Sequence, residues 1–130
     1  MTDADVKSWF AEYLSTFAAC GRGERELNAL LGYYGVPILV TTDGGSSALT
    51  SDAQVLAMAK QQIDGMRAQY DHSDLLEASV SVVNASSALY RGEFARVRKD
   101  GTEINRLLVS YLITEGASGR RISALLVHHR

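Results

Sequence analysis

Four segments in the C-terminal half of the chain have the length and composition of β-strands, and three of them are strongly apolar. They contain many β-branched and aromatic residues and no proline, a composition that suits a pleated surface. An Asp-Gly pair at Asp100-Gly101 and two glycines within residues 115–119 suit tight reversals between them. We therefore predict a continuous antiparallel meander of four strands, at residues 75–83, 88–98, 103–114 and 121–129.

The N-terminal segment predicts an amphipathic helix over residues 3–20. Its apolar residues recur at steps of three and four, which places them on one stripe that faces the core. Gly21 follows the last periodic residue, at a position where a left-handed C-cap costs least. The stripe consists of Val6, Trp9, Phe10, Tyr13, Leu14 and Phe17.

Two more helices and a short strand pair fill the rest of the first half. A helix is expected over residues 24–33, and another from Ser51 to about Tyr70. Ser51 and Gln54 form a capping-box pattern at the start of the second of these helices. Between them, a β run at residues 38–42 leads into an Asp43-Gly44-Gly45 turn and a brief edge strand at residues 47–49. The helices should cover one face of the sheet.

Composition indicates one ordinary globular domain over residues 1–130. The chain is 46% hydrophobic and 22% charged, and its length is sufficient for a single core. A net charge of −2 gives no basic surface for nucleic acid and no polybasic membrane anchor. The acidic start of the chain and the single cysteine, Cys20, favour a cytoplasmic protein, and no apolar stretch has the length of a membrane span.

The order of elements resembles the nuclear transport factor 2-like superfamily over essentially the whole chain. The resemblance implies an α+β, cone-shaped, cystatin-like fold in which three N-terminal helices pack on a curved antiparallel sheet and enclose a pocket. It also implies a homodimer joined through the outer sheet face, but it selects no reaction. Local matches are Cys20-Gly21, Leu30-Leu31-Gly32-Tyr33-Tyr34, Val40-Thr41-Thr42-Asp43 and Ser51-Asp52.

Two residues are candidates for catalysis by this resemblance. Ketosteroid-isomerase-like members of the superfamily place a carboxylate base near the end of the first strand, where Asp43 lies, and a helix tyrosine to which Tyr13 is similar. The alternatives are that Asp43 only begins the Asp-Gly-Gly turn and that Tyr13 is a core residue. The late strand carries no acid in residues 107–114, in contrast to those isomerases.

Alternation along the strands identifies further pocket residues. Residues 103–114 are largely apolar on both faces, so one face should contact the helices and the other a second subunit. On the preceding strand, Tyr90 and Arg96 share one face, while Arg91 and Glu93 share the other, at a cavity mouth or a subunit rim. The residues expected to line the pocket are Trp9, Phe17, Tyr34, Tyr90, Arg106, Ser110 and His128.

No motif indicates a metal or a cofactor. His128 and His129 are adjacent on a predicted strand, so only one can enter a pocket, and the alternative is that both are solvated. No HxH, HxxxH, CxxC or phosphate-loop spacing occurs in the sequence. We therefore expect no metal and no cofactor.

Two functional classes remain open. The first is a pocket protein for a small, mostly apolar molecule, in the sharpest form a cofactor-independent isomerase, lyase or cyclase. The second is a non-catalytic dimeric module with a vestigial pocket. Polar groups that converge inside the cone, such as Asp43 with Tyr13 or Arg106, would favour an enzyme. An interior filled by aliphatic and phenylalanine side chains would favour the module.

Overall fold

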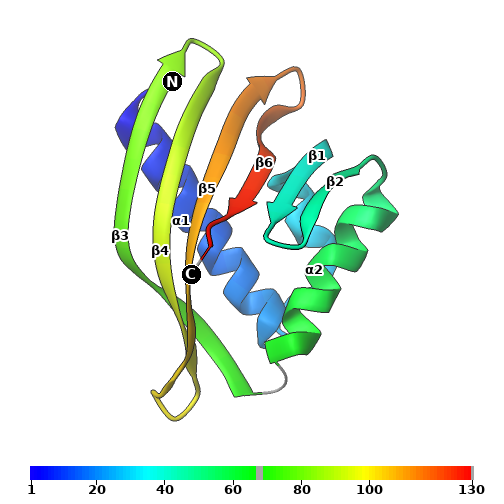
Figure 1. The fold of residues 1–130 in the computed structure, drawn as a ribbon, viewed down its shortest axis with the longest axis vertical. Coiled ribbons are helices and arrows are strands. Elements are labelled where there is room, and N and C mark those ends of the chain that lie inside the picture. The colour runs from blue at the N-terminus through cyan, green and yellow to red at the C-terminus, as the bar shows by residue number, and fades with distance from the viewer. Residues whose placement is uncertain (67–68, 130) are drawn as a thin grey trace.

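The computed structural model describes residues 1–66 and 69–129. Within those residues, no helix is long and apolar enough to cross a membrane. Figure 1 shows a curved sheet with the long helix α1 behind it and α2 beside the short strands β1 and β2. The elements in chain order are α1 (Asp3–Gly21), the 3₁₀ helix η1 (Leu27–Gly32), β1 (Tyr34–Thr42), β2 (Gly45–Leu49), α2 (Asp52–Met66), β3 (Tyr70–Asn84), β4 (Ser87–Arg98), β5 (Glu103–Gly116) and β6 (Gly119–Val127).

All six strands form one sheet in the order β2-β1-β6-β5-β4-β3. The predicted meander is confirmed, because β3 to β6 pair antiparallel in sequence order. The predicted strand pair, β1 and β2, joins the same sheet through a parallel pairing of β1 with β6, which the sequence pattern did not predict. The α+β fold with helices on a curved sheet is therefore confirmed.

Helix α1 buries four of the six residues of the predicted stripe and leaves Trp9 and Leu14 half-buried. Its N-cap is Thr2, whose hydroxyl accepts a hydrogen bond from the Asp5 amide at 3.1 Å. Gly21 is the last residue of α1, and the left-handed C-cap predicted there is wrong, since positive φ occurs instead at Gly23. A Cβ on Gly21 would lie 2.6 Å from the Tyr70 ring, so close packing explains this glycine. The helix thereby anchors the start of β3.

Two helix boundaries differ from the prediction. The helix expected over residues 24–33 is the shorter 3₁₀ helix η1, because the preceding Glu26 has an extended backbone and the Glu24 carboxylate pairs with Arg22. Helix α2 ends at Met66, not near Tyr70, and residues 67–68 lie outside the described part. Tyr70 begins β3 and buries its ring against α1, so tertiary packing overrides the helical period.

The start of edge strand β3 carries a histidine held by two carboxylates. The Nδ1 of His72 lies 2.8 Å from Asp71 and its Nε2 lies 3.0 Å from Asp74. Both ring nitrogens can donate only when the imidazole is protonated. The hydrogen bond to Asp71 and the charge of Asp74 therefore raise the pKa of His72.

We expect His72 to titrate above its ordinary value of 6.5. Because the native pKa is raised, this pairing stabilises the fold fully below pH 6.5, and the stabilisation declines as the pH rises through the native pKa. An NMR titration of the imidazole measures the value. Asp71→Asn should move it back towards 6.5, whereas a wild-type pKa at or below 6.5 would contradict the pairing.

Candidate functional site

An aromatic cluster joins α1 to the inner face of the sheet. The Phe10 ring stacks on Tyr90 with centroids 3.8 Å apart and meets Tyr111 edge-on at 4.8 Å. Tyr13, one turn further along α1, contacts Phe10 at 5.2 Å. Phe94 of β4 lies on the same face. This cluster fixes how far α1 stands from β4 and β5, and so sets the width of the space beyond it.

That space contains an inner pocket between α1, α2 and the sheet. Its cavity volume is about 50 Å³, well below the roughly 300–1,000 Å³ of a site for a drug-sized ligand. Most of its lining is aromatic or aliphatic, so it suits a small apolar molecule. The lining residues are Tyr13, Leu14, Phe17, Gln62, Ser73, Phe94, Arg96, Leu107, Val109, Tyr111, Leu125 and Val127.

Three polar side chains from three elements lie together in this lining. Arg96 of β4 and Ser73 of β3 are partners across the two strands. The Arg96 guanidinium donates a hydrogen bond to the Gln62 carbonyl oxygen on α2 at 3.2 Å. The Ser73 hydroxyl bonds the hydroxyl of Tyr70 at 2.9 Å. The pocket thus has one polar part within a mostly apolar wall.

The buried tyrosines in and beside the inner pocket are neutral hydrogen-bonding groups. The hydroxyls of Tyr13 and Tyr34 lie 2.7 Å apart in the core. Burial raises the pKa of Tyr34 to about 12 and raises the pKa values of Tyr13 and Tyr111 as well. These phenols therefore keep their protons at neutral pH and can donate hydrogen bonds, but they are poor bases.

The structure separates the two candidate catalytic residues. Tyr13 lines the inner pocket, whereas Asp43 lies in the turn between β1 and β2 with a side chain 68% exposed. The Asp43 carboxylate lies 2.7 Å from the Nδ1 of the exposed His129. A catalytic base at Asp43 would need a carboxylate shielded from water in a pocket. The exposed side chain of Asp43 does not have that environment.

The predicted pocket residues are distributed over several places. Phe17 lines the inner pocket, and Tyr34 and Tyr90 are buried in the core beside it. Trp9 packs on Tyr33 at 5.5 Å, next to a separate surface hollow. The remaining three predicted residues, Arg106, Ser110 and His128, lie away from the inner pocket, on the opposite face of the sheet. Arg106 is exposed and forms an ion pair with Glu103. The Ser110 hydroxyl forms a hydrogen bond with His128 at 2.7 Å.

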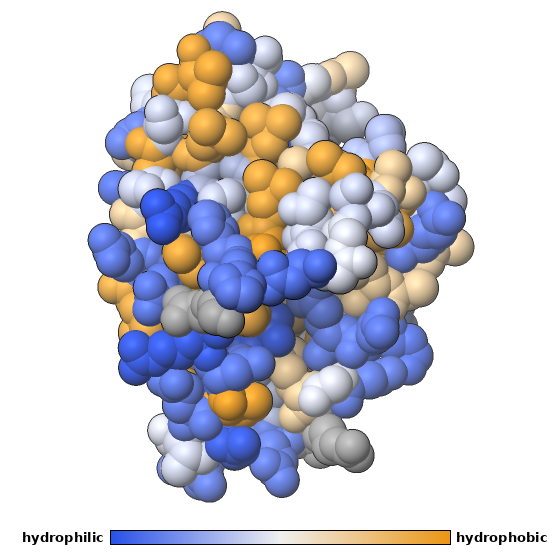
Figure 2. All heavy atoms as spheres, viewed as in Figure 1, coloured by the Kyte–Doolittle hydropathy of each residue, from blue (hydrophilic) through white to orange (hydrophobic). Residues whose placement is uncertain are grey.

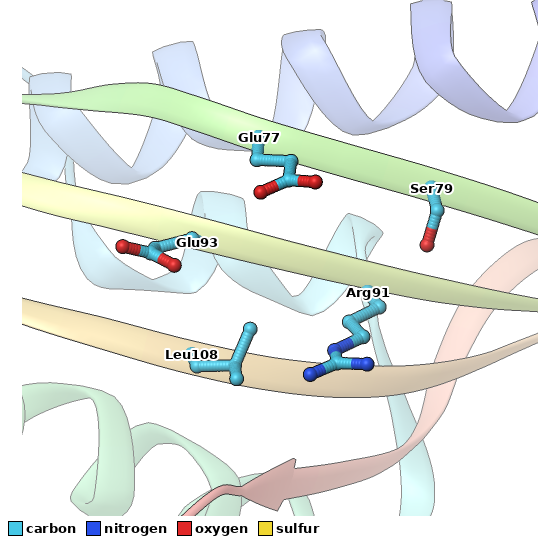
Figure 3. Close-up of a pocket in the computed structure, with 5 residues that line it drawn as sticks. All are labelled: Glu77, Ser79, Arg91, Glu93 and Leu108. Carbon is cyan, nitrogen blue, oxygen red and sulfur yellow. The ribbon is translucent and has the colours of Figure 1, made fainter. Parts of the chain in front are cut away.

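The outer face of the sheet carries a second cleft, of about 180 Å³. Figure 3 shows its side chains on three adjacent strands: Glu77 and Ser79 on β3, Arg91 and Glu93 on β4, and Leu108 on β5. In Figure 2, hydrophobic side chains gather on the upper part of this face and hydrophilic ones on the lower part. The outer cleft is thus the more polar of the two.

A family model described as NTF2-like protein (DUF6841) matches residues 3–130. The chain belongs to this NTF2-like family. No curated protein matches the sequence. The family assignment confirms the resemblance that the order of elements indicated, and it assigns no ligand to this NTF2-like protein.

Solved structures show the same fold at low sequence identity. A protein of unknown function with a cystatin-like fold from Nostoc punctiforme PCC 73102 has a TM-score of 0.76 at 11% identity, with 98% of this chain and 92% of that chain covered. An NTF2-like protein with a cystatin-like fold from Novosphingobium aromaticivorans has a TM-score of 0.70 at 17% identity, with 94% and 77% covered. A further Nostoc punctiforme domain of unknown function is 19% identical, with a TM-score of 0.71 and 100% and 80% covered.

Sequence reasoning missed Gln62 and Ser73 and left the place of Arg96 open between a cavity mouth and a subunit rim. The signal for Arg96 was its shared face with Tyr90, which alternation had identified. The helical period places Gln62 beside the inward-facing stripe of α2, but its place in the pocket depends on how α2 lies against β4. The arginine chosen for the pocket, Arg106, lies on the opposite face of the sheet, where it is the strand partner of Ala95.

Proposed function

We propose that this NTF2-like protein binds a small, mostly apolar molecule in the inner pocket. The observation that carries this proposal is the lining, in which Tyr13, Phe17, Phe94 and Tyr111 surround a cavity that the core leaves open. Apolar walls with a few convergent polar groups are typical of small-molecule sites. The cavity of about 50 Å³ is smaller than the roughly 150 Å³ of a cavity that encloses benzene, so a one-ring or short-chain compound would enter it in part and extend through its open side.

The geometry favours binding over catalysis. General acid–base chemistry needs a group that can exchange a proton near neutral pH within hydrogen-bond reach of the ligand. Within residues 1–66 and 69–129, neither a carboxylate nor an imidazole lines the inner pocket. The phenols there are held neutral by burial. An isomerase, lyase or cyclase acting through Asp43 would require the β1–β2 turn to approach this pocket.

A pair of substitutions on neighbouring residues of β5 tests the proposal. Leu107 lines the inner pocket, and Leu108 lines the outer cleft on the opposite face. Both are half-buried, so tryptophan at either position makes a similar change in bulk. With one-ring aromatic and six-carbon aliphatic probes, saturation-transfer NMR should detect binding to the wild type and to Leu108→Trp but not to Leu107→Trp. Equal binding to both variants, or no binding to the wild type, would refute the proposal.

A homodimer formed through the outer face is the second candidate function. Leu89 is 47% exposed on this face, next to its strand partner Leu112. Glu77 and Glu93 are partners on adjacent strands and give the outer cleft two acidic side chains. Arg91 lies in the same cleft, so a two-fold axis could bring each Arg91 to the glutamates of a second copy. This pattern is complementary to itself.

We expect sedimentation equilibrium at micromolar concentration to give a mass near twice the 14.1 kDa of one chain. Arg91→Glu should shift the equilibrium towards the monomer, because it places three acids in the cleft. Lys60→Glu makes an identical charge change on the exposed face of α2 and serves as the control. It should leave the monomer–dimer equilibrium unchanged. A wild-type mass that stays near 14.1 kDa as concentration rises would exclude the dimer.

A further inference from the structure

Among the residues that the structure describes, Arg96 is the only cation in the lining of the inner pocket. It is half-buried on β4, and alternation along the strand places it on the same face as Phe94. A guanidinium has five N–H donors, and one of them is used in the hydrogen bond to Gln62. Arg96 takes part in none of the ion pairs found among residues 1–66 and 69–129.

The described residues around Arg96 supply no negative charge to the pocket. The lining contains no carboxylate. The guanidinium lowers the pKa values of Tyr13, Tyr34 and Tyr111, but burial raises them by more, so these phenols stay neutral. A cation that is partly removed from water is stabilised further by a neighbouring anion, and the one hydrogen bond described for Arg96 goes to the neutral amide of Gln62. Such an anion can come from a ligand.

We propose that the ligand of the inner pocket is a small carboxylate, bound through its anionic group to Arg96. This inference rests on the proposed function and specifies its ligand class. The planar guanidinium can donate two parallel hydrogen bonds to a carboxylate. Gln62 and Ser73 flank the same position and can bond further oxygen atoms. The apolar body of the ligand then contacts the rings of Phe94 and Tyr111 and the side chain of Leu107.

The test uses pairs of probes that differ only in charge: benzoate with benzamide, and hexanoate with hexanamide. Isothermal titration at low salt should show each carboxylate binding the wild type at least about tenfold more tightly than its amide, the range of a charge-assisted hydrogen bond. Arg96→Met should abolish this preference. Arg96→Lys should retain part of it, because the charge remains without the planar fork. Added salt should weaken the binding of the carboxylates alone.

Arg91→Met is the matched control, since Arg91 is on the same strand but in the outer cleft. It should keep the carboxylate preference. Carboxylate and amide that bind the wild type equally would overturn the inference while the proposed function stands. A preference that disappears in Arg91→Met and persists in Arg96→Met would also overturn it. Failure of every probe to bind would refute the proposed function and this inference with it. Circular dichroism confirms that each variant is folded.

Discussion

Phe10→Ala is expected to lower the free energy of unfolding by about 3–5 kcal/mol, the cost of truncating a buried aromatic side chain. Phe10 is 0% exposed and contacts Tyr90, Phe94 and Tyr111 on two strands as well as Tyr13 on its own helix. The substitution removes apolar contacts and leaves a cavity that rigid neighbouring rings cannot fill. Denaturant unfolding measures the loss.

Lys7→Ala provides the comparison for this prediction. Lys7 is exposed on the same helix, so its truncation should cost well under about 1 kcal/mol. If the two variants had similar denaturation midpoints, the aromatic cluster would not be the main link between α1 and the sheet. A change in the slope of the denaturation curve would indicate an altered denatured state.

The sequence pattern predicted those elements whose periodicity is regular. The stripe on α1 was correct because its apolar residues recur at steps of three and four, and the meander from β3 to β6 was correct because its strands have long runs of strand-like composition between turn residues. The errors lie where tertiary packing decides. Tyr70 fits a helical period, yet its ring is buried between Phe17 and Gly21 at the start of β3. The parallel pairing of β1 with β6 joins distant segments, which local periodicity cannot show.

The candidate site was less predictable than the fold. Alternation correctly grouped Tyr90 with Arg96, and Arg91 with Glu93, on opposite faces of β4. It could not state which face meets the helices, because both faces of the neighbouring strand β5 are apolar. Asp43 was chosen by its position at the end of β1, and only the structure shows that its side chain remains exposed. A pocket depends on distances between elements, and sequence spacing does not encode these.

Strand β4 links the two candidate functions through its two faces. Its inner face carries Tyr90, Phe94 and Arg96, and its outer face carries Leu89, Arg91 and Glu93. A ligand that moves Phe94 or Arg96 therefore acts on the strand that also forms the outer cleft. The position between the two inner aromatic residues is Gly92, which has no side chain to separate them.

Gly92→Ala is the second substitution for which we expect a large effect. A Cβ at this position would lie 2.6 Å from the Phe94 ring and 3.1 Å from the Tyr90 ring. Overpacking of this kind costs about 1–3 kcal/mol, which exceeds the gain of about 0.4–1 kcal/mol from reduced backbone freedom in the unfolded chain. The net result should be a less stable protein, measured by thermal and denaturant unfolding.

The position of the Phe94 ring gives this prediction a second readout. Because Phe94 lines the inner pocket, the displaced ring should also weaken the binding of small aromatic probes. Gly65→Ala is the control, since a Cβ at that exposed position of α2 meets no atom within 4 Å. It should leave binding unchanged and, as an alanine in a helix, leave stability equal or higher. A Gly92→Ala protein with wild-type stability and binding would show that the Phe94 ring moves without cost, and that the aromatic wall of the pocket is not rigid.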